Sequence, residues 1–306
     1  MNAARFLVLR GGALGDFIVT LPALTALRER WPEAEIELVG YPHFARLAGE
    51  AGLVNQVTSL HGAQIARLFS LRPEFPDEQV RWLRSFDFVL NYLHDPDGLV
   101  VDNLKRAGAR TVLSGSPLVV DGHAIDQLVK PLEGLAIYAT GAAARLDLGP
   151  DASVEGRART AVEGPFALLH PGSGSTRKNW PTERFLALAR RLQAERGWTP
   201  VFLTGEADEA AAAQLNALAP EVRHLRNLDI SAAARVLSAA AFYIGNDSGI
   251  THLAAAVGTP TLALFGPSSP RQWAPRGEHV RVIQAPGGDL AALSADAAWA
   301  YVRASG

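Results

Sequence analysis

The chain has 306 residues, of which 48% are hydrophobic and 20% charged, so it is long enough for two globular domains with full cores. Its formal net charge of −2 gives no broad electrostatic attraction for nucleic acid, and we expect no nucleic-acid partner. The chain contains no cysteine, which excludes disulfides, thiolate nucleophiles and cysteine-ligated zinc.

The N-terminus, Met1 to Arg10, runs directly into an apolar segment. It lacks the charged start, apolar middle and small-residue cleavage site of a signal peptide. No run of about 18 apolar residues occurs, so no membrane-spanning helix is expected. We therefore expect a cytoplasmic protein, and peripheral contact with the inner membrane stays open.

In the N-terminal half, short apolar or β-branched runs alternate with longer amphipathic runs, which predicts βα units and parallel sheets. In chain order, the expected elements are strand 6–9, tight loop 11–15, helix 17–30, strand 35–39 and strand 86–90. Pro22 is an irregularity inside the expected helix 17–30, and residues from about 111 to 164 are less regular.

A second alternation follows in the C-terminal half. The expected elements are strand 166–169, a helix opening at Pro181, strand 200–203, helices 206–219 and 231–240, strand 242–244, helix 249–257, strand 261–265 and helix 290–303. Gly149-Pro150 breaks the chain between the halves, and we place the boundary between about 145 and 163. The predicted domains are residues 1–155 and 156–306.

Three loops that follow strands carry the functional argument, because ligands of open α/β sheets bind beyond the carboxyl ends of the strands. The first reads Arg10-Gly-Gly-Ala-Leu-Gly-Asp16. Its glycines let the backbone approach a ligand closely, but they match neither G-x-G-x-x-G nor a P-loop. Asp16 can face an acceptor hydroxyl, or it can cap a helix that starts at Phe17.

The second loop runs from His170 to Pro181 and enters a helix. It combines glycines, three hydroxyl side chains and two cations, which suits a diphosphate that needs both N–H donors and charge neutralisation. The alternative is a solvated basic loop with Trp180 packed inward.

The third loop is Gly245-Asn-Asp-Ser-Gly-Ile-Thr-His252, at the start of a predicted helix. The free N–H groups of a helix N-terminus bind anions, so this loop is a second candidate phosphate site. An equally good explanation is a well-capped helix in which His252 is a satisfied polar group.

Together the three loops resemble the heptosyltransferase family, the ADP-heptose:lipopolysaccharide group of GT-B glycosyltransferases, glycosyltransferase family 9. The matching segments are Leu9 to Leu24 with its Gly-Asp and Leu-Pro-Ala-Leu, His170 to Pro181, and Asn246 to Ala255 followed by Gly258-Thr-Pro260 and Leu264-Phe-Gly-Pro267. The resemblance covers the first ~50 residues and most of 166–275, and it is weak over about 55–160, where acceptor contacts would lie.

The resemblance implies an α/β GT-B fold with two facing Rossmann-like domains, parallel sheets and a cleft between them. The N-terminal domain would bind a glycan or glycolipid acceptor, and the C-terminal domain a nucleotide diphosphate sugar, ADP-heptose in this family. In such folds the last helix often returns to the first domain, and helix 290–303 could do this. No cofactor is expected.

The resemblance also implies an inverting transfer and the residues that perform it. Asp16 matches the family's proposed general base, and Lys178 its phosphate-binding lysine. Arg10 stands where relatives usually carry Lys, and its guanidinium suits bidentate phosphate contact. The remaining predicted substrate-binding residues are Gly11, Gly12, Gly15, Ser173, Ser175, Thr176, Glu206, Asp247, Ser248, Gly249, Thr251 and His252.

Two assignments stay open. Glu206 matches the region where the family places an acidic residue on the ribose, and Asp208 competes with it. Asp95-Pro-Asp97 is a D-x-D, which ligates a metal–nucleotide in GT-A transferases, but its proline favours a turn and acceptor contact is a further option. We expect no metal site.

Three rival functions share this pattern. A nucleotide-sugar epimerase uses the same scaffold and needs no acceptor. A nucleotide-sugar-binding protein without catalysis would also carry the phosphate loops. A dinucleotide oxidoreductase is disfavoured, because neither domain starts with G-x-G-x-x-G.

Overall fold

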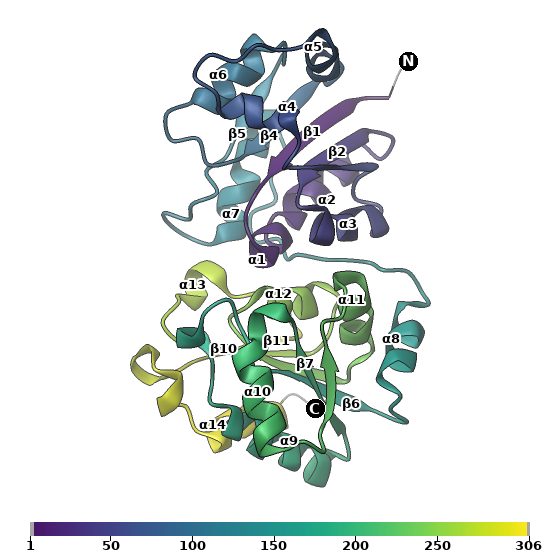
Figure 1. The fold of residues 1–306 in the computed structure, drawn as a ribbon, viewed down its shortest axis with the longest axis vertical. Helices are drawn as coiled ribbons and strands as arrows, with labels where there is room; N and C mark the ends of the chain where they lie inside the picture. The colour runs from purple at the N-terminus through teal and green to yellow at the C-terminus, as the bar shows by residue number, and fades with distance from the viewer. Residues whose placement is uncertain (1–2, 305–306) are drawn as a thin grey trace. The chain divides into compact units, whose positions relative to one another are not determined.

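The computed structural model describes residues 3–304, and the chain divides into two compact units, Met1–Ala142 and Ala143–Gly306 (Figure 1). Each unit is an α/β domain built on a parallel sheet, as the alternating pattern predicts. Among the described residues, no helix is long and apolar enough to cross a membrane.

The sheet of the first unit has five strands in the order β3-β2-β1-β4-β5, all parallel. Its strands are β1 (Arg5–Arg10), β2 (Glu35–Gly40), β3 (Gln56–Ser59), β4 (Phe88–Tyr92) and β5 (Val112–Ser114). The central strands β1 and β4 are almost entirely buried, which explains their largely apolar sequences.

The helices of the first unit connect these strands (Figure 1). They are α1 (Leu14–Ile18), α2 (Leu21–Arg30), α3 (Pro42–Glu50), α4 (Ala63–Ala66), α5 (Asp77–Arg84), α6 (Leu99–Arg106) and α7 (Ala124–Val129), with 3-10 turns η1 (Arg67–Phe69) and η2 (Lys130–Leu135). The single helix expected over 17–30 is wrong: the chain forms α1 and α2. Pro22 occupies the first turn of α2, where its missing N–H costs nothing, so it starts a helix.

The sheet of the second unit has six parallel strands in the order β11-β10-β9-β6-β7-β8. They are β6 (Phe166–His170), β7 (Thr199–Thr204), β8 (Arg223–Arg226), β9 (Phe242–Asn246), β10 (Thr261–Phe265) and β11 (Val280–Gln284). The four strands expected from the sequence are all present. The edge strands β8 and β11 were not expected, because polar residues such as Arg223, His224 and Arg281 interrupt their apolar runs.

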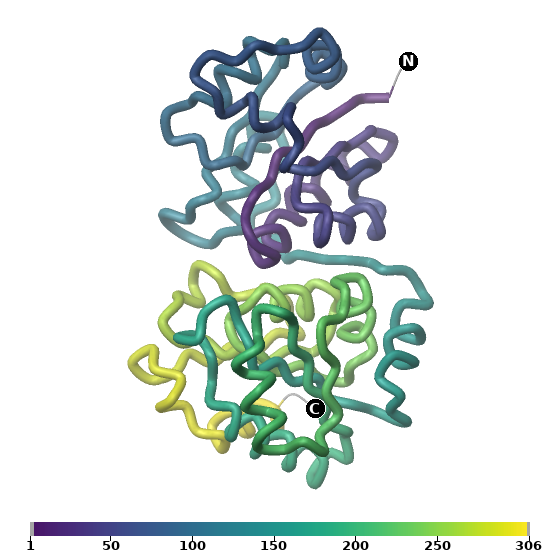
Figure 2. Tube along the Cα trace, viewed as in Figure 1, coloured from purple at the N-terminus to yellow at the C-terminus, as the bar shows by residue number. Residues whose placement is uncertain are grey.

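The helices of the second unit can be followed along the chain in Figure 2. They are α8 (Ala152–Thr160), α9 (Thr182–Arg196), α10 (Glu209–Leu218), α11 (Ile230–Ala239), α12 (Gly249–Ala256), α13 (Pro270–Trp273) and α14 (Ala295–Arg303). Short 3-10 turns are η3 (Thr176–Lys178), η4 (Glu206–Asp208), η5 (Pro286–Gly288) and η6 (Leu290–Ala292).

Contacts of two helices define the extent of the second unit. Helix α8 lies along α11 (Figure 1), and Leu146 N donates to Ala256 O at 2.8 Å. The residues from Ala143 onward therefore belong to the second unit, whereas the sequence placed the division at 155/156. Helix α14 packs on α9 of the same unit, where Trp299 is buried in the core.

Candidate functional site

Each sheet has a switch point, where two neighbouring strands have their connections leading in opposite directions. In the first sheet it lies between β1 and β4, and in the second between β6 and β9. Loops that leave such strands diverge and open a crevice at the carboxyl edge, which is the usual ligand site of an open α/β sheet. The three loops singled out in the sequence follow β1, β6 and β9.

Asp16 lies in the first turn of α1, directly after the loop that leaves β1. Its Oδ2 accepts a hydrogen bond from Ala13 N at 2.9 Å, and 31% of its side chain is exposed. A carboxylate at this position satisfies a free N–H and interacts favourably with the helix dipole. Asp16 does cap a helix, but that helix begins at Leu14, and the residue still presents its carboxylate to solvent.

Arg10, the last residue of β1, is buried beneath this loop with 3% of its side chain exposed. Its Nε and Nη2 donate to Asp16 O at 3.2 and 3.0 Å, and Nε also donates to Thr20 Oγ1 at 2.9 Å. Nη2 lies 3.4 Å from Asp16 Oδ1. Burial lowers the pKa of the guanidinium, and the Asp16 carboxylate opposes that effect.

This placement differs from the phosphate contact expected for Arg10. The guanidinium uses Nε and Nη2 to hold the backbone and the carboxylate of Asp16 from below. Thr20 reinforces the arrangement, because its hydroxyl donates to the same carbonyl, Asp16 O, at 2.8 Å. Arg10 and Thr20 thus fix the direction in which Asp16 faces.

The glycines of the first loop make room for this geometry. Gly12 has a φ of +95°, and a Cβ there would lie 2.7 Å from Asp16 Oδ2, so a side chain would be strained and would displace the carboxylate. Gly11 is half-buried between Leu60 and Leu93, and Gly15 lies within α1.

Lys178 and Asp247 form an ion pair across the switch point of the second sheet. Lys178 Nζ donates to Asp247 Oδ2 at 2.7 Å, and Ser268 Oγ donates to the same oxygen. Asp247 is 8% exposed and Lys178 is 35% exposed. The pairing of β6 with β9 brings these two distant segments together. A buried carboxylate therefore holds an ammonium group that faces solvent.

Helix α12 starts beside this ion pair. Ser248 is its N-cap, and Ser248 Oγ accepts from Thr251 N at 3.3 Å. Ser248 and Gly249 are half-exposed at the helix N-terminus, where free N–H groups favour an anion. His252 is buried in the first turn, with 6% of its surface exposed.

Thr251 was expected to donate a backbone or hydroxyl hydrogen bond to the diphosphate, and both of these groups have partners within the protein. It is fully buried, its hydroxyl donates to Asn246 O, and the oxygen lies 2.9 Å from Tyr243 Oη. Thr251 instead fixes the start of α12. Burial raises the pKa of Tyr243, so its phenol stays a neutral hydrogen-bonding partner.

The loop after β6 has a fixed shape in which its hydroxyls differ in role. Ser173 is buried, and its Oγ lies 2.6 Å from both Ser175 O and Asn179 Oδ1. Ser175 and Thr176 are exposed. Ser173 therefore shapes the loop, while Ser175 and Thr176 are the hydroxyls available to a ligand.

The choice between Glu206 and Asp208 follows from their burial. Asp208 is 8% exposed, its Oδ2 accepts from Gly205 N at 2.8 Å, and it lies 3.8 Å from His170 Nε2. Its carboxylate presses on Gly172, where a Cβ would lie 1.9 Å from Asp208 Oδ1. Asp208 thus supports the loop after β6, and the exposed Glu206 is the acid that faces solvent.

The D-x-D sequence is a capped turn. Asp95 Oδ1 accepts from Val100 N at 2.9 Å and Oδ2 from Val101 N at 3.0 Å, so both oxygens cap α6. Asp97 is exposed on the same turn. Within residues 3–304, no group of three or more His, Asp or Glu side chains is arranged to hold a metal ion.

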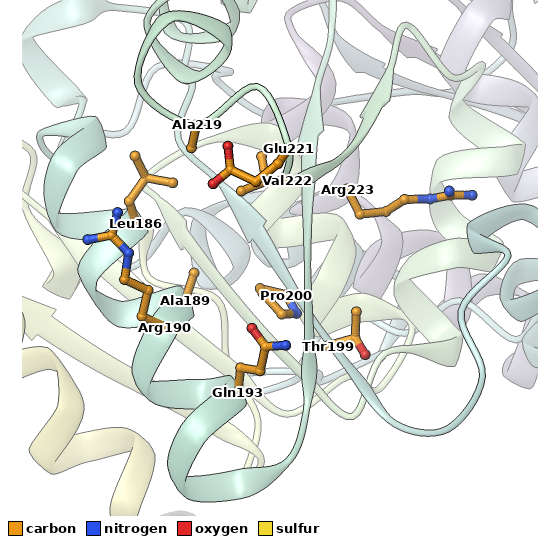
Figure 3. A pocket seen from close by; sticks show the side chains of 10 residues that line it. All are labelled: Leu186, Ala189, Arg190, Gln193, Thr199, Pro200, Ala219, Glu221, Val222 and Arg223. Atoms are coloured by element: carbon orange, nitrogen blue, oxygen red, sulfur yellow. The ribbon is translucent and has the colours of Figure 1, made fainter.

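Two hollows in the described part of the second unit differ in size and position. The smaller, of about 250 Å³, is lined by Ser175, Arg177, Lys178, Pro267 and Ser268 at the carboxyl edge. The larger, of about 380 Å³, lies between α9 and the amino ends of β7 and β8 (Figure 3), with Arg190, Gln193 and Glu221 on its rim. Of these two, the smaller lies where the switch-point loops converge, so it is the better ligand site despite its size.

Two functional residues were missed from the sequence. Asn246 is fully buried, and its side chain donates to Pro171 O at 2.9 Å and Gly172 O at 3.2 Å and accepts from Trp180 N at 3.0 Å. It therefore joins the loops after β6 and β9. Ser268, which holds Asp247, follows β10. Asn246 could have been found from the sequence, because it is a polar residue at the end of an otherwise apolar strand. Nothing in the local sequence distinguishes Ser268.

Comparison with known proteins adds an independent finding. A model of glycosyltransferase family 9 (heptosyltransferase) matches residues 124–296. The chain is 28% identical to lipopolysaccharide heptosyltransferase 1 of Pseudomonas aeruginosa, over 87% of this chain and 79% of that protein. It is 24% identical to lipopolysaccharide heptosyltransferase 1 of Escherichia coli O18:K1:H7, over 97% of each.

The family model covers more than half of the chain. The chain belongs to glycosyltransferase family 9. It is therefore a glycosyltransferase, and the family match does not favour the epimerase alternative. The match includes the loops after β6 and β9, whereas the Asp16 loop precedes residue 124.

Solved family 9 structures have the same fold. The E. coli heptosyltransferase WaaC with ADP superimposes with a TM-score of 0.73 at 21% identity, covering 99% of this chain and 100% of that chain. The family 9 glycosyltransferase from Veillonella parvula gives a TM-score of 0.80 at 20% identity, covering 99% and 97%. The GT-B fold implied by the sequence is thereby confirmed.

Proposed function

We propose that this family 9 enzyme is an inverting heptosyltransferase that transfers heptose from ADP-heptose to a hydroxyl of a lipopolysaccharide-core acceptor. The observation that carries the proposal is the convergence of Lys178 and the N-terminus of α12 at one switch point. A cation and free N–H groups at one sheet edge are what a nucleoside diphosphate leaving group requires.

The second unit would hold the donor. Lys178, with Ser175, Thr176, Ser248 and Gly249, would bind the diphosphate, and Glu206 would accept hydrogen bonds from the ribose hydroxyls. ADP-heptose is the proposed donor because WaaC has been solved with ADP and with ADP-2-deoxy-2-fluoro heptose.

The first unit would hold the acceptor. Its hydroxyl oxygen attacks the anomeric carbon on the face opposite the diphosphate, the new C–O bond forms as the bond to the diphosphate breaks, and Asp16 accepts the hydroxyl proton. ADP leaves with the bonding electrons, and Lys178 and α12 neutralise its developing charge. Attack from the opposite face inverts the anomeric configuration.

A direct assay tests this function. Purified protein is incubated with ADP-heptose, with and without a deacylated lipopolysaccharide-core acceptor, and products are identified by mass spectrometry. We expect ADP and an acceptor heavier by one heptose, formed only when acceptor is present. An altered nucleotide sugar formed from donor alone would identify an epimerase, and donor binding without turnover would identify a binding protein.

The same assay tests the proposed independence from metal ions. Lys178 and the α12 N-terminus supply positive charge at the diphosphate site, so excess chelator should leave the rate unchanged. Loss of activity that Mg²⁺ or Mn²⁺ restores would contradict this mechanism. Because the proposed acceptor is a membrane glycolipid, the protein should also act peripherally at the cytoplasmic face of the inner membrane, which sedimentation with acceptor-containing vesicles would test.

A further inference from the structure

Three aromatic side chains gather at the carboxyl edge of the first sheet, and no motif of the sequence pointed to them. Tyr41 follows β2 directly, His43 lies in the first turn of α3, and His61 follows β3 by two residues. The Tyr41 ring lies 5.3 Å from the His61 ring and 6.0 Å from the His43 ring, measured between centroids. Two imidazoles therefore flank one phenol.

The polar edges of this cluster face solvent. His43 and His61 are exposed, and Tyr41 is half-buried. Among the described residues, neither imidazole has an ion-pair partner or a hydrogen bond to its ring nitrogens. Phe44 is buried and forms the floor, 4.4 Å from the His43 ring and 5.8 Å from the Tyr41 ring. Phe44 thus packs beneath the cluster, and the ring nitrogens and the phenol have no hydrogen-bond partner within the described residues.

The cluster lies close to the proposed base. The ring of Phe44 packs 5.4 Å from that of Phe17, the residue after Asp16. Leu60 N donates to Gly40 O at 2.9 Å, which ties the ends of β2 and β3 together, and a Cβ on Gly11 would lie 3.5 Å from Leu60. The aromatic cluster and the Asp16 loop therefore share one sheet edge within the first unit.

We propose that Tyr41, His43 and His61 form an acceptor subsite for a sugar ring that carries an anionic group, a carboxylate or a phosphate. The phenol ring packs against the C–H face of the sugar, as aromatic side chains do with flat, partly apolar surfaces. The imidazole N–H groups donate to the anion, and a protonated imidazole adds charge to that hydrogen bond. The assignment to the acceptor rests on the proposed function.

Steady-state kinetics give the first test. In the double variant H43A/H61A the KM for the lipopolysaccharide-core acceptor should rise about tenfold or more, the loss expected for hydrogen bonds to a charged group. The KM for ADP-heptose should stay unchanged, because the donor binds the other unit. Y41L should raise the acceptor KM, while Y41F, which keeps the ring, should not. Y138L, which removes an exposed tyrosine elsewhere in this unit, is the matched control.

Direct binding gives a second readout that needs no turnover. Imidazole NMR signals, assigned by their loss in H43A and H61A, are followed as millimolar glucose, glucuronic acid or glucose 6-phosphate is added to the full chain. The signals should move with an anionic sugar and not with glucose. A response to only one anionic probe identifies carboxylate or phosphate as the recognised group.

The two tests separate the failure of this subsite from the failure of the proposed function. If the wild-type protein transfers heptose but the double variant keeps the wild-type acceptor KM, the subsite is wrong and the function stands. The subsite is also overturned if glucose moves the imidazole signals as much as the anionic probes, or if no probe moves them. If the wild type transfers no heptose although the anionic probes bind, the function fails and the anionic-sugar site remains.

Discussion

The loops at the two switch points contain ion pairs of opposite arrangement. In the first unit the cation is buried and the anion faces solvent, with Arg10 3% and Asp16 31% exposed. In the second unit the anion is buried and the cation faces solvent, with Asp247 8% and Lys178 35% exposed. Each unit thus presents one charge, and that charge is held by an opposite charge beneath it.

The two opposite arrangements suit the two halves of a transfer reaction on one type of scaffold. A proton acceptor must be an exposed carboxylate, and a leaving diphosphate needs an exposed cation. An exposed charged side chain can adopt several rotamers, and a buried partner of opposite charge holds it in one of them. The buried members, Arg10 and Asp247, are accordingly positioning residues.

The largest effect should follow from D16N. Asparagine keeps the shape and most of the capping hydrogen bond but is far less basic, so kcat should fall by about 10²–10⁴-fold. The melting temperature should stay near wild type, because Arg10 and Thr20 bond to the backbone carbonyl of residue 16. Donor affinity, measured by calorimetry, should be unchanged. Full turnover in D16N would reduce Asp16 to a helix cap.

The exposed cation of the second unit should rank next. K178A should lower kcat/KM by at least about tenfold, or 1.4 kcal/mol, because charge on the leaving diphosphate loses its partner. D247N should lower it less, since the ammonium remains but loses its anchor. The double variant should resemble K178A alone, because both changes act on one pair. Additive losses would mean that Asp247 acts independently of Lys178.

The sequence was sufficient to locate the exposed members of both pairs. Asp16 directly follows a glycine-rich loop and Lys178 lies within one, and both loops leave buried strands, so the local pattern placed them correctly at the sheet edges. The buried strands of the second sheet were also predictable, because their apolar runs are short and alternate with longer amphipathic runs, which favours strands over helices.

The partners were not predictable in the same way. Arg10 and Thr251 were both expected to contact a ligand. In the structure each side chain is buried and forms hydrogen bonds within its own loop. The Lys178–Asp247 pair depends on β6 lying beside β9, which is a property of strand order and not of local sequence. The Tyr41 and His61 rings meet for the same reason, across β2 and β3.

The buried cation of the first unit gives a sharper test of positioning. R10M should lower kcat severalfold to about tenfold while both KM values hold, because the Asp16 loop loses its hydrogen bonds but the binding surfaces persist. R10K, which keeps a cation beneath the loop, should restore part of the lost kcat. A loss of stability with an unchanged kcat would make Arg10 purely structural.

The smallest effect should come from S268A, which removes the second donor to Asp247 while the ion pair stays. Lys178 Nζ still donates to Asp247 Oδ2, so the carboxylate keeps a partner and only the precision of its position declines. We expect kcat/KM to fall by about two- to fivefold, or less than about 1 kcal/mol. Ser269, whose side chain makes no capping hydrogen bond, provides the matched control S269A, which should retain wild-type kinetics. If S268A loses as much activity as K178A, the hydroxyl contacts the diphosphate itself, and the buried anion alone does not determine where the exposed cation stands.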